Sequence, residues 1–277
     1  MKIDCERIAT AMLEEAKQRF EAMRKPESPC NRDNFPSLSI IKVGNDPASE
    51  VYVRNKVRVC ADLGVESMVY HLPADCDQQT LELTIERIVD DFSPHGIILQ
   101  LPLPGHLNAD DAAMYIPLNM DVDGLHDNSG VTPCTPRGIM AILDGEGVEL
   151  SGKHAVIIGR SKLVGKPLAK LLLERDCTVT VCHSKTADLA EITRTADILI
   201  SAVGKPGLIE LGMVKPGAII IDVGISRVDG KLVGDADPWF SDPHCEVYRC
   251  TPVPGGVGKT TVAALMLNLA ELAGTRK

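Results

Sequence analysis

The chain lacks an excess of positive charge and lacks any long apolar run. Its 277 residues hold 29 Lys and Arg against 38 Asp and Glu, a formal net charge of −9. Nucleic acids and anionic membranes attract basic patches, so neither is expected as a partner. No apolar stretch approaches the ~20 residues that a membrane helix needs. The charged first residues do not form a signal peptide, and internal repeats and low-complexity segments are absent.

Paired cysteine motifs are also missing. The nine cysteines are an odd number, and none forms a C-x-x-C pair. This pattern disfavours a disulfide framework and favours a reducing cytoplasm. Cys182-His183 has no second ligand pair at zinc spacing. Cys182 is therefore expected to be a buried residue at a strand end, and no metal site is predicted.

Strand and helix patterns alternate along most of the chain, which predicts an α/β fold with parallel sheets. The content of hydrophobic residues, 44%, provides for one large or two ordinary domains. Strands are predicted over 38–43, 65–72, 96–101, 153–159, 178–182, 198–202 and 218–223. Helices are predicted around residues 8–20 and Tyr52 and over 81–92, 138–143, 167–174, 187–195 and 260–273. The strand–helix rhythm after residue 153 is that of a Rossmann-type unit.

The usual dinucleotide fingerprint, G-x-G-x-x-G, is absent. In its place Gly159 ends a strand, and the loop to Gly165 opens a helix. Such a loop offers backbone amides and a positive helix end to a phosphate. The next strand ends in His183-Ser184-Lys185-Thr186, without the acid that NAD enzymes place there. Arg160 and Ser184 could instead bind the 2′-phosphate of NADP, so NADP is favoured over NAD as the cofactor. Lys185 is equally consistent with a solvated charge.

Tyr52 and Lys56 lie four residues apart in a helical pattern, which puts an aromatic ring and an ammonium group on one face. Such a pair can hold a flat ligand and move protons. Gln100 follows an apolar strand and precedes two prolines, Pro102 and Pro104, that forbid further strand pairing. Ligands gather at the carboxyl ends of strands in open α/β sheets. Taken singly, these residues are typical of a core position, a solvated charge and a strand-end cap.

Further motifs favour a functional interpretation of these residues over the structural one. They are Y-x-x-x-K at 52–56, Q-L-P-L-P at 100–104, D-V-D-G at 121–124, P-C-T-P-R-G at 133–138, G-R-S-x-x-V-G-x-P at 159–167 and P-G-G-V-G at 254–258. In this order, over nearly the whole chain, they resemble the bifunctional methylenetetrahydrofolate dehydrogenase/cyclohydrolase family. The resemblance implies oxidation of 5,10-methylenetetrahydrofolate with NADP and hydrolysis of the methenyl product to 10-formyltetrahydrofolate. It also implies a cytoplasmic homodimer in one-carbon metabolism and purine biosynthesis.

The resemblance also assigns domains and residues. Residues 1–136 would form a folate-binding catalytic domain completed by 252–277, to which the C-terminal helix returns. Residues 137–251 would form the Rossmann-type NADP-binding domain. Lys56 would activate water, Tyr52 would stack on the folate, Gln100 would orient Lys56, and Asp123 would anchor the pterin. The backbone would approach the folate at Pro254, Gly255 and Gly256. Cofactor contacts would come from Thr135, Gly159, Arg160, Ser161, Gly165 and Ser184. Asp121 is interpreted as a turn former.

The sequence departs from the family at Lys259-Thr260, where Pro-Met is usual, and at Met120, where Lys is usual. The span from Asp123 to Pro133 is also short. An ammonium at a helix N-terminus opposes the dipole, so Lys259 should project to solvent or meet an anion. The available anions are the folate glutamate tail and the cofactor phosphates, and we expect Lys259 to lie within reach of one of them.

The sequence also suggests three other functions. One is an NADP-dependent dehydrogenase acting on another substrate, and a second is a folate-binding homologue with impaired catalysis. The third, an ATPase, is suggested by G-K-T-T at 258–261. The ATPase is rejected because the phosphate-loop pattern needs glycine where Val253 stands.

Overall fold

A computed structural model of the chain describes residues 2–23, 35–241 and 249–275. The backbone divides into two compact units. Unit 1 comprises Met1–Ala11 and Thr135–Ala264, and unit 2 comprises Met12–Cys134 and Leu265–Lys277. Each unit is an α/β structure with a parallel sheet, as the alternating pattern predicts. The division into a folate-binding domain (1–136 with 252–277) and an NADP-binding domain (137–251) stays a prediction.

The sheet of unit 2 has three parallel strands in the order β2-β1-β3. Their bounds are Ser37–Val43 for β1, Glu66–Leu72 for β2 and Gly96–Leu99 for β3. Ile40 of β1 lies opposite Val69 on one side and Ile98 on the other. The central strand is buried on both faces, which explains its nearly continuous apolar sequence. The edge strand β2 keeps Met68 and Val69 exposed.

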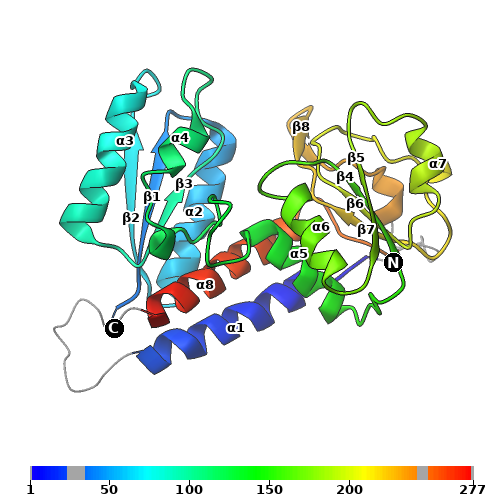
Figure 1. Cartoon of the computed structure of the whole chain (residues 1–277), viewed down its shortest axis with the longest axis horizontal. Coiled ribbons are helices and arrows are strands. Elements are labelled where there is room, and N and C mark those ends of the chain that lie inside the picture. Colours follow the sequence, from blue (N-terminus) through cyan, green and yellow to red (C-terminus); the bar gives the residue numbers. More distant parts are fainter. Residues whose placement is uncertain (1, 24–34, 242–248, 276–277) are drawn as a thin grey trace. The chain divides into compact units, whose positions relative to one another are not determined.

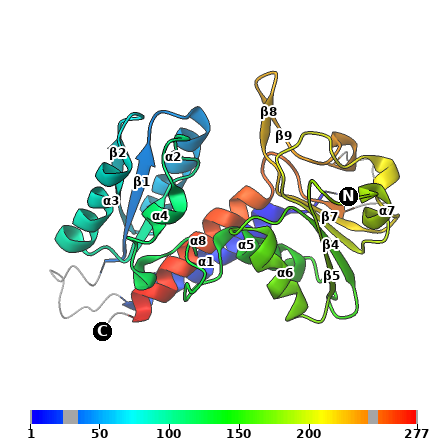
Figure 2. The same ribbon diagram turned by 45° about the horizontal axis from the view of Figure 1, so that its top comes forward.

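Helices α2 (Pro47–Asp62) and α3 (Gln78–Arg87) cover opposite faces of this sheet (Figures 1 and 2). Right-handed crossovers require this arrangement, because the chain moves one way from β1 to β2 and the other way from β2 to β3. Each helix starts at an aspartate cap, Asp46 accepting from the Ser49 amide and Asp77 from the Thr80 amide. The smaller elements of unit 2 are the π-helical turn η2 (Ile88–Phe92), α4 (Ala109–Ala113) and the 3₁₀ turn η3 (Leu118–Met120).

Unit 1 contains a five-stranded parallel sheet in the order β10-β7-β6-β4-β5. Its strands are β4 (His154–Ile158), β5 (Thr178–Cys182), β6 (Ile198–Ser201), β7 (Ile219–Asp222) and β10 (Arg249–Cys250). Its helical elements are α5 (Cys134–Gly145), α6 (Gly165–Leu173), α7 (Leu189–Thr193), η4 (Leu211–Met213) and η5 (Pro238–Ser241). The strand order reverses direction at β4, between β5 and β6. This reversal is the topological switch point at which doubly wound sheets bind dinucleotides.

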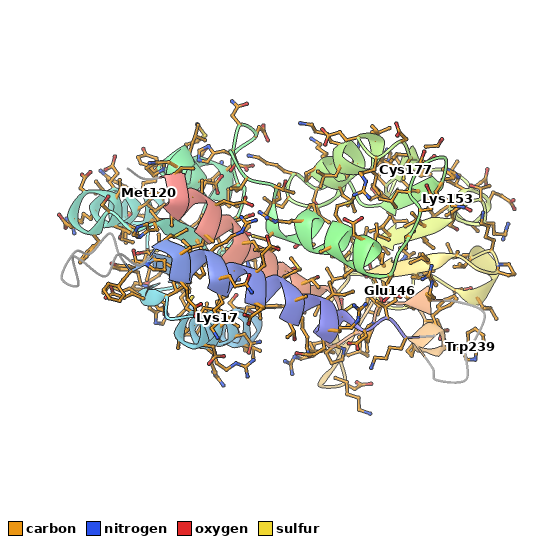
Figure 3. All side chains as sticks on the ribbon, turned by 90° about the horizontal axis from the view of Figure 1, so that it is seen from below. Lys17, Met120, Glu146, Lys153, Cys177 and Trp239 are labelled. Atoms are coloured by element: carbon orange, nitrogen blue, oxygen red, sulfur yellow. The ribbon has the colours of Figure 1, made fainter. Side chains whose placement is uncertain are left out.

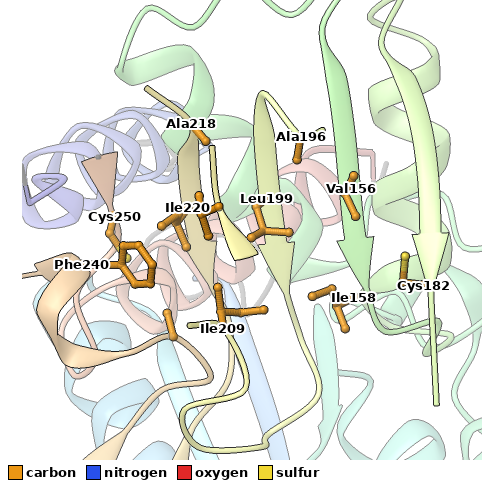
Figure 4. Close-up of a cluster of buried hydrophobic side chains, with 12 residues drawn as sticks. Val156, Ile158, Cys182, Ala196, Leu199, Ile209, Ala218, Ile220, Phe240 and Cys250 are labelled. Atoms are coloured by element: carbon orange, nitrogen blue, oxygen red, sulfur yellow. The ribbon is translucent and has the colours of Figure 1, made fainter. Parts of the chain in front are cut away.

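One face of the unit 1 sheet packs into an apolar cluster, and Phe240 lies at one side of it, beside Cys250 (Figure 4). Val156, Leu199 and Ile220 come from three neighbouring strands and are fully buried. Phe240, from η5, is also 0% exposed. Burying a side chain of this size contributes roughly 1.5–3 kcal/mol. The cluster therefore anchors the segment after β7 on the sheet.

The two longest helices, α1 (Cys5–Met23) and α8 (Val257–Thr275), contribute residues to both units. In unit 2, Arg19 donates to the Glu271 carboxylate at 3.2 Å. Gly96 of β3 has no room for a side chain, since an added Cβ would lie 2.4 Å from Val122 and 2.9 Å from Leu269 of α8. The second part of α8 thus packs on the unit 2 core, as expected of a returning C-terminal helix. Among the described residues, no helix combines the length and the apolar character that a membrane crossing requires.

In unit 1 the start of α1 is held by ion pairs near the end of α5. Glu146 pairs with Arg7 and with Arg249, each at 3.7 Å (Figure 3). The Arg7 guanidinium also donates to the Gly145 carbonyl at 2.9 Å. Gly145 ends α5, two residues beyond the helix predicted over 138–143.

The predicted elements are present, with differences at their ends. The helix predicted over 81–92 begins at Gln78 and finishes as the π-helical turn η2. The strand predicted to 101 ends at Leu99, because Gln100 and the following prolines leave the sheet. The antiparallel hairpin of β8 (Ser226–Val228) and β9 (Lys231–Val233) was not predicted. Its strands are short and largely exposed, so they carry little hydrophobic signal.

Candidate active site

Helix α2 of unit 2 presents Tyr52 and Lys56 one turn apart, both half-buried. Burial raises the pKa of the Tyr52 hydroxyl. The ring is therefore a neutral, flat surface at physiological pH. One turn beyond Lys56 lies Cys60, which is fully buried and has a pKa raised by burial to about 12. That thiol is a packing residue and no nucleophile.

The Lys56 ammonium donates to Gln100 Oε1 at 2.9 Å. Gln100 directly follows β3 and is 7% exposed. Its own amide nitrogen donates to the Leu101 carbonyl at 2.7 Å, and its backbone N–H donates to Ile41 at 2.8 Å. These bonds fix which end of the Gln100 amide faces Lys56. The lysine is thus aimed by a side chain that is itself immobilised at the carboxyl end of a strand.

Asp123 lies half-buried in a turn that other residues hold rigidly. Asp121 is fully buried, and its carboxylate accepts the backbone N–H groups of Leu125 and His126, each at 3.0 Å. The interpretation of Asp121 as a turn former is confirmed. Gly124 has a φ of +70°, where glycine is favoured, and an added Cβ would lie 2.9 Å from Pro133. The Asp123 carboxyl is therefore presented from a fixed backbone.

Asn268 of α8 completes this support, although sequence reasoning missed it. Its side-chain amide donates to the carbonyls of Val122 at 2.8 Å and Thr132 at 2.9 Å. Asn268 is 0% exposed, and the buried residues on either side of it in α8, from Ala263 to Ala273, are all apolar. A lone asparagine in such a helix was the available signal, because buried polar groups need partners.

The glycine loop of unit 1 leaves no room for side chains at its two glycines. Gly159 follows β4 with a φ of +119°, and a Cβ there would lie 2.7 Å from the Ala202 carbonyl oxygen. A Cβ on Gly165 would lie 2.1 Å from the Gly159 carbonyl oxygen. Ser161 shapes the loop between them, since its hydroxyl accepts the Val164 N–H at 3.2 Å. This backbone fits a phosphate at the start of α6.

The side chains around this loop suit a 2′-phosphate. Arg160 in the loop and Ser184 and Lys185 after β5 are all exposed. The loop after β5 is closed by its own bonds, with the His183 N–H donating to the Thr186 hydroxyl at 2.8 Å. No acidic residue stands between Cys182 and Ala187. An NAD-type ribose acceptor is therefore missing from this loop.

Thr135, the remaining predicted cofactor residue, lies at the start of α5. The hydroxyl of Thr261 donates to the Thr135 hydroxyl at 3.4 Å. Helices α5 and α8 are closely packed here, because a Cβ on Gly138 would lie 2.8 Å from the Thr260 hydroxyl.

Pro254, Gly255 and Gly256 belong to unit 1 and precede α8. Gly255 has a φ of +94°, and a Cβ on Gly256 would lie 2.2 Å from the Pro252 carbonyl oxygen. Pro254 and Gly255 are exposed, which leaves their backbone accessible to a ligand.

Two of the departures from the family pattern, Thr260 and Lys259, bond to other residues of the chain. Thr260 is fully buried and donates its hydroxyl to the Val257 carbonyl at 3.0 Å. Lys259 forms an ion pair with Glu6 in the first turn of α1. The anion that Lys259 meets in the structure is therefore a carboxylate of the chain itself, whereas the sequence predicted the folate tail or a cofactor phosphate. Met120 is buried, at 6% exposure, at the end of η3 (Figure 3).

The fold and these residues define an NADP-linked enzyme of folate chemistry. Residues 3–123 match the catalytic domain of the tetrahydrofolate dehydrogenase/cyclohydrolase family, and residues 133–277 match its NAD(P)-binding domain. The chain belongs to this family.

Its relatives include proteins named bifunctional protein FolD. That of Bordetella petrii is 44% identical over 98% of this chain and 93% of its own length. Bifunctional protein FolD 2 of Pseudomonas syringae pv. tomato is 48% identical over 86% of this chain and 83% of its own.

Solved structures agree in fold. The Campylobacter jejuni FolD methylenetetrahydrofolate dehydrogenase/cyclohydrolase is 39% identical, with a TM-score of 0.90 over 100% of this chain and 99% of that one. The Trypanosoma brucei enzyme, solved with NADP and an inhibitor, is 34% identical, with a TM-score of 0.89 over 99% and 97%.

Proposed function

We propose that this protein oxidises 5,10-methylenetetrahydrofolate with NADP and hydrolyses the resulting methenyl form to 10-formyltetrahydrofolate. The observation that carries this proposal is the Lys56–Gln100 hydrogen bond beside Tyr52, in a chain of the dehydrogenase/cyclohydrolase family. A lysine aimed by a fixed amide is suited to proton transfer and is unnecessary for hydride transfer alone.

In the oxidation, the substrate's methylene carbon loses a hydride and becomes the methenyl carbon. NADP, when bound, accepts that hydride at its nicotinamide ring. Tyr52 offers a flat neutral face on which the folate ring stacks, and Asp123 offers a carboxylate to the donors of the pterin edge. The glycine loop of unit 1, with Gly159, Ser161 and Gly165, would hold the cofactor phosphates. Thr135 is assigned to the cofactor and Pro254, Gly255 and Gly256 to the folate by family resemblance.

In the hydrolysis, water adds to the methenyl carbon and loses a proton. This leaves a hydroxyl group on that carbon. The bond from that carbon to N5 then breaks as N5 gains a proton and the hydroxyl group loses its own, which leaves a formyl group on N10. Lys56 is placed to accept and return these protons, and Gln100 to hold it in position. The reaction releases one proton overall.

A homodimer in the cytoplasm completes the proposal. The cytoplasm is supported by the cysteines, since the seven that the structure describes are all buried and form no disulfide. The net charge of −9 supports the expectation of no nucleic-acid partner. The homodimer rests on family resemblance.

A spectrophotometric assay tests the function. With methylenetetrahydrofolate as substrate, kcat/KM is expected to be at least tenfold higher with NADP than with NAD, which is about 1.4 kcal/mol of discrimination. Arg160→Ala should narrow this preference through the KM for NADP. Arg227→Ala, which removes a guanidinium from the exposed β8 strand of the same unit, serves as the control. Equal efficiency with both cofactors would contradict the charge argument, and no turnover with either would contradict the function.

A further inference from the structure

Two buried carboxylates in unit 1 have no part in the function described above. Asp222 is the last residue of β7 and is 4% exposed, and Asp235 follows β9 and is 0% exposed. Both lie at the carboxyl edge of the sheet, the edge at which a dinucleotide binds. Buried aspartates are rare unless they are paired or hydrogen-bonded, so each requires a reason.

The reason lies in their hydrogen bonds, all of which are accepted. Asp235 accepts the Ser201 hydroxyl at 2.8 Å and the backbone N–H groups of Val203 at 2.9 Å and Lys205 at 2.6 Å. Asp222 accepts the N–H groups of Gly224 at 3.0 Å, Asp235 at 3.0 Å and Ala236 at 2.9 Å. Six donors thus converge on four carboxylate oxygens. In an asparagine, an NH2 group would replace one carboxylate oxygen and would face the N–H or O–H groups that the oxygen accepts from. This explains why both residues are acids.

The packing around the pair is tight enough to require glycine at two places. A Cβ on Gly224 would lie 2.1 Å from the Asp235 carboxylate, and one on Gly234 would lie 1.9 Å from that of Asp222. The oxygens face backbone donors, and no group of three or more potential metal ligands occurs among the described residues. The pair therefore holds these loops together.

The loops that it fastens adjoin the glycine loop. Asp235 fixes Val203 and Lys205, which follow β6, and the hydroxyl of Ser226 after β7 donates to the Gly204 carbonyl at 3.0 Å. On its other side, Gly159 approaches the Ala202 carbonyl so closely that a Cβ would lie 2.7 Å from it. The 203–205 loop thus stands beside the phosphate loop on the β6 and β7 side of the switch point. Arg160 and Ser184 draw the adenosine 2′-phosphate toward β5, so the nicotinamide half falls on the side of the 203–205 loop.

We propose that Asp222 and Asp235 are positioning residues that hold the loops after β6 and β7 in the form that receives the nicotinamide half of NADP. The proposal rests on the function given above. Holding the loops before the cofactor arrives avoids the entropy cost of ordering them on binding. Neither carboxylate touches the ligand in this account, since both are enclosed by the backbone that they bind.

The test compares two ligands on the purified full chain by titration calorimetry. NADP has both halves of the dinucleotide, whereas 2′,5′-ADP has the 2′-phosphate and adenosine but no nicotinamide. In Asp235→Asn, the dissociation constant for NADP is expected to rise at least tenfold and that for 2′,5′-ADP less than twofold. In steady-state assays the KM for NADP should rise more than kcat falls, because saturating cofactor restores the loop order.

Two further variants complete the experiment. Asp229→Asn removes a carboxylate from the exposed turn between β8 and β9 and should bind both ligands as the wild type does. If Asp235→Asn does not fold, as judged by circular dichroism, Ser201→Ala replaces it, because it removes a single hydrogen-bond donor from Asp235. Ser201→Ala should raise the dissociation constant for NADP and leave that for 2′,5′-ADP unchanged. If the variant binds both ligands more weakly by the same factor, or if a folded variant binds NADP as the wild type does, the positioning role is overturned. A wild type that binds no NADP would instead overturn the proposed function.

Discussion

The candidate residues of unit 2 and the glycine loop of unit 1 present their chemistry differently. In unit 2 the functional groups are side chains, and the decisive contact joins the side chains of Lys56 and Gln100. In unit 1 the backbone itself is the functional surface, and close approaches at Gly159 and Gly165 shape it. A side chain can be removed from unit 2 while its fold is kept. An added atom in the unit 1 loop must move the backbone first.

The buried carboxylates of the two units extend this comparison. Asp121 in unit 2 accepts two backbone N–H groups and holds the turn that carries Asp123, a side chain with a proposed ligand. Asp222 and Asp235 in unit 1 hold loops whose own backbone is the expected ligand surface. Both units thus use charge-assisted bonds to fix irregular backbone. They differ in the group that faces the expected ligand, which is a side chain in unit 2 and the backbone in unit 1.

The largest expected effect concerns Lys56. Lys56→Met keeps much of the apolar stem and removes the titrating group, so cyclohydrolase turnover should fall by about 10²–10⁴-fold. NADP binding, measured by calorimetry, should stay within twofold. Lys17→Met is the matched control, because Lys17 is exposed on α1 (Figure 3). Methenyl hydrolysis at the wild-type rate in Lys56→Met would remove Lys56 from the mechanism.

The second prediction addresses the backbone character of unit 1. In Gly165→Ala the new Cβ would lie 2.1 Å from the Gly159 carbonyl oxygen, so the loop must shift. A displacement of this kind should weaken NADP binding about 100-fold. Gly212→Ala is the control, since a Cβ there meets nothing within 4 Å and its φ is not positive. Normal NADP affinity in Gly165→Ala would mean that side chains, and not the loop backbone, hold the cofactor.

The features of the fold and the site that could be predicted from the sequence are those set by local patterns. The unit 2 set was predictable because a helix repeats every 3.6 residues, so Tyr52 and Lys56 must share a face. The prolines after Gln100 predicted that the strand stops close to that residue, and β3 ends one residue before it, at Leu99. Both features are local, and so were the strand and helix patterns that gave the fold.

The missed features depend on contacts between residues far apart in the chain. Asp235 bonds residues 30 to 34 positions earlier, and Asn268 bonds Val122 from 146 positions later. No spacing rule connects such residues, and Asp222 and Asp235 each look like ordinary turn acids in the sequence. Lys259 was predicted to meet an anion, but its partner Glu6 lies near the other end of the chain.

A third prediction uses the pH dependence of stability. Burial raises the pKa of Asp222 from 3.8 to about 6, with nearby Asp235 adding to the rise and backbone donors opposing it. The folded chain therefore binds this proton more tightly than the unfolded chain. The stability contribution of Asp222 is greatest at low pH and falls as the pH rises from about 3.8 to about 6.

Urea unfolding of the wild type and of Asp222→Asn measures this dependence. Between pH 4.5 and pH 7, the free energy of unfolding of the wild type should fall relative to that of the variant by about 2 kcal/mol. A difference that does not change with pH would mean that the Asp222 carboxyl ionises as easily in the folded as in the unfolded chain.

The smallest expected effect concerns Lys259, whose ion pair with Glu6 is largely exposed. Exposed pairs contribute about 0–1 kcal/mol, and the ammonium also opposes the N-terminal dipole of α8. Lys259→Ala should therefore change the free energy of unfolding by less than about 1 kcal/mol, and less still in 1 M salt. Because Glu6 already satisfies the ammonium, folate and NADP dissociation constants should stay within twofold. Glu6→Gln is the matched variant, since it frees Lys259 without removing it. Polyglutamylated folate that binds more tightly to Glu6→Gln than to the wild type, and more weakly to Lys259→Ala, would show instead that Lys259 exchanges its carboxylate partner for the substrate's tail.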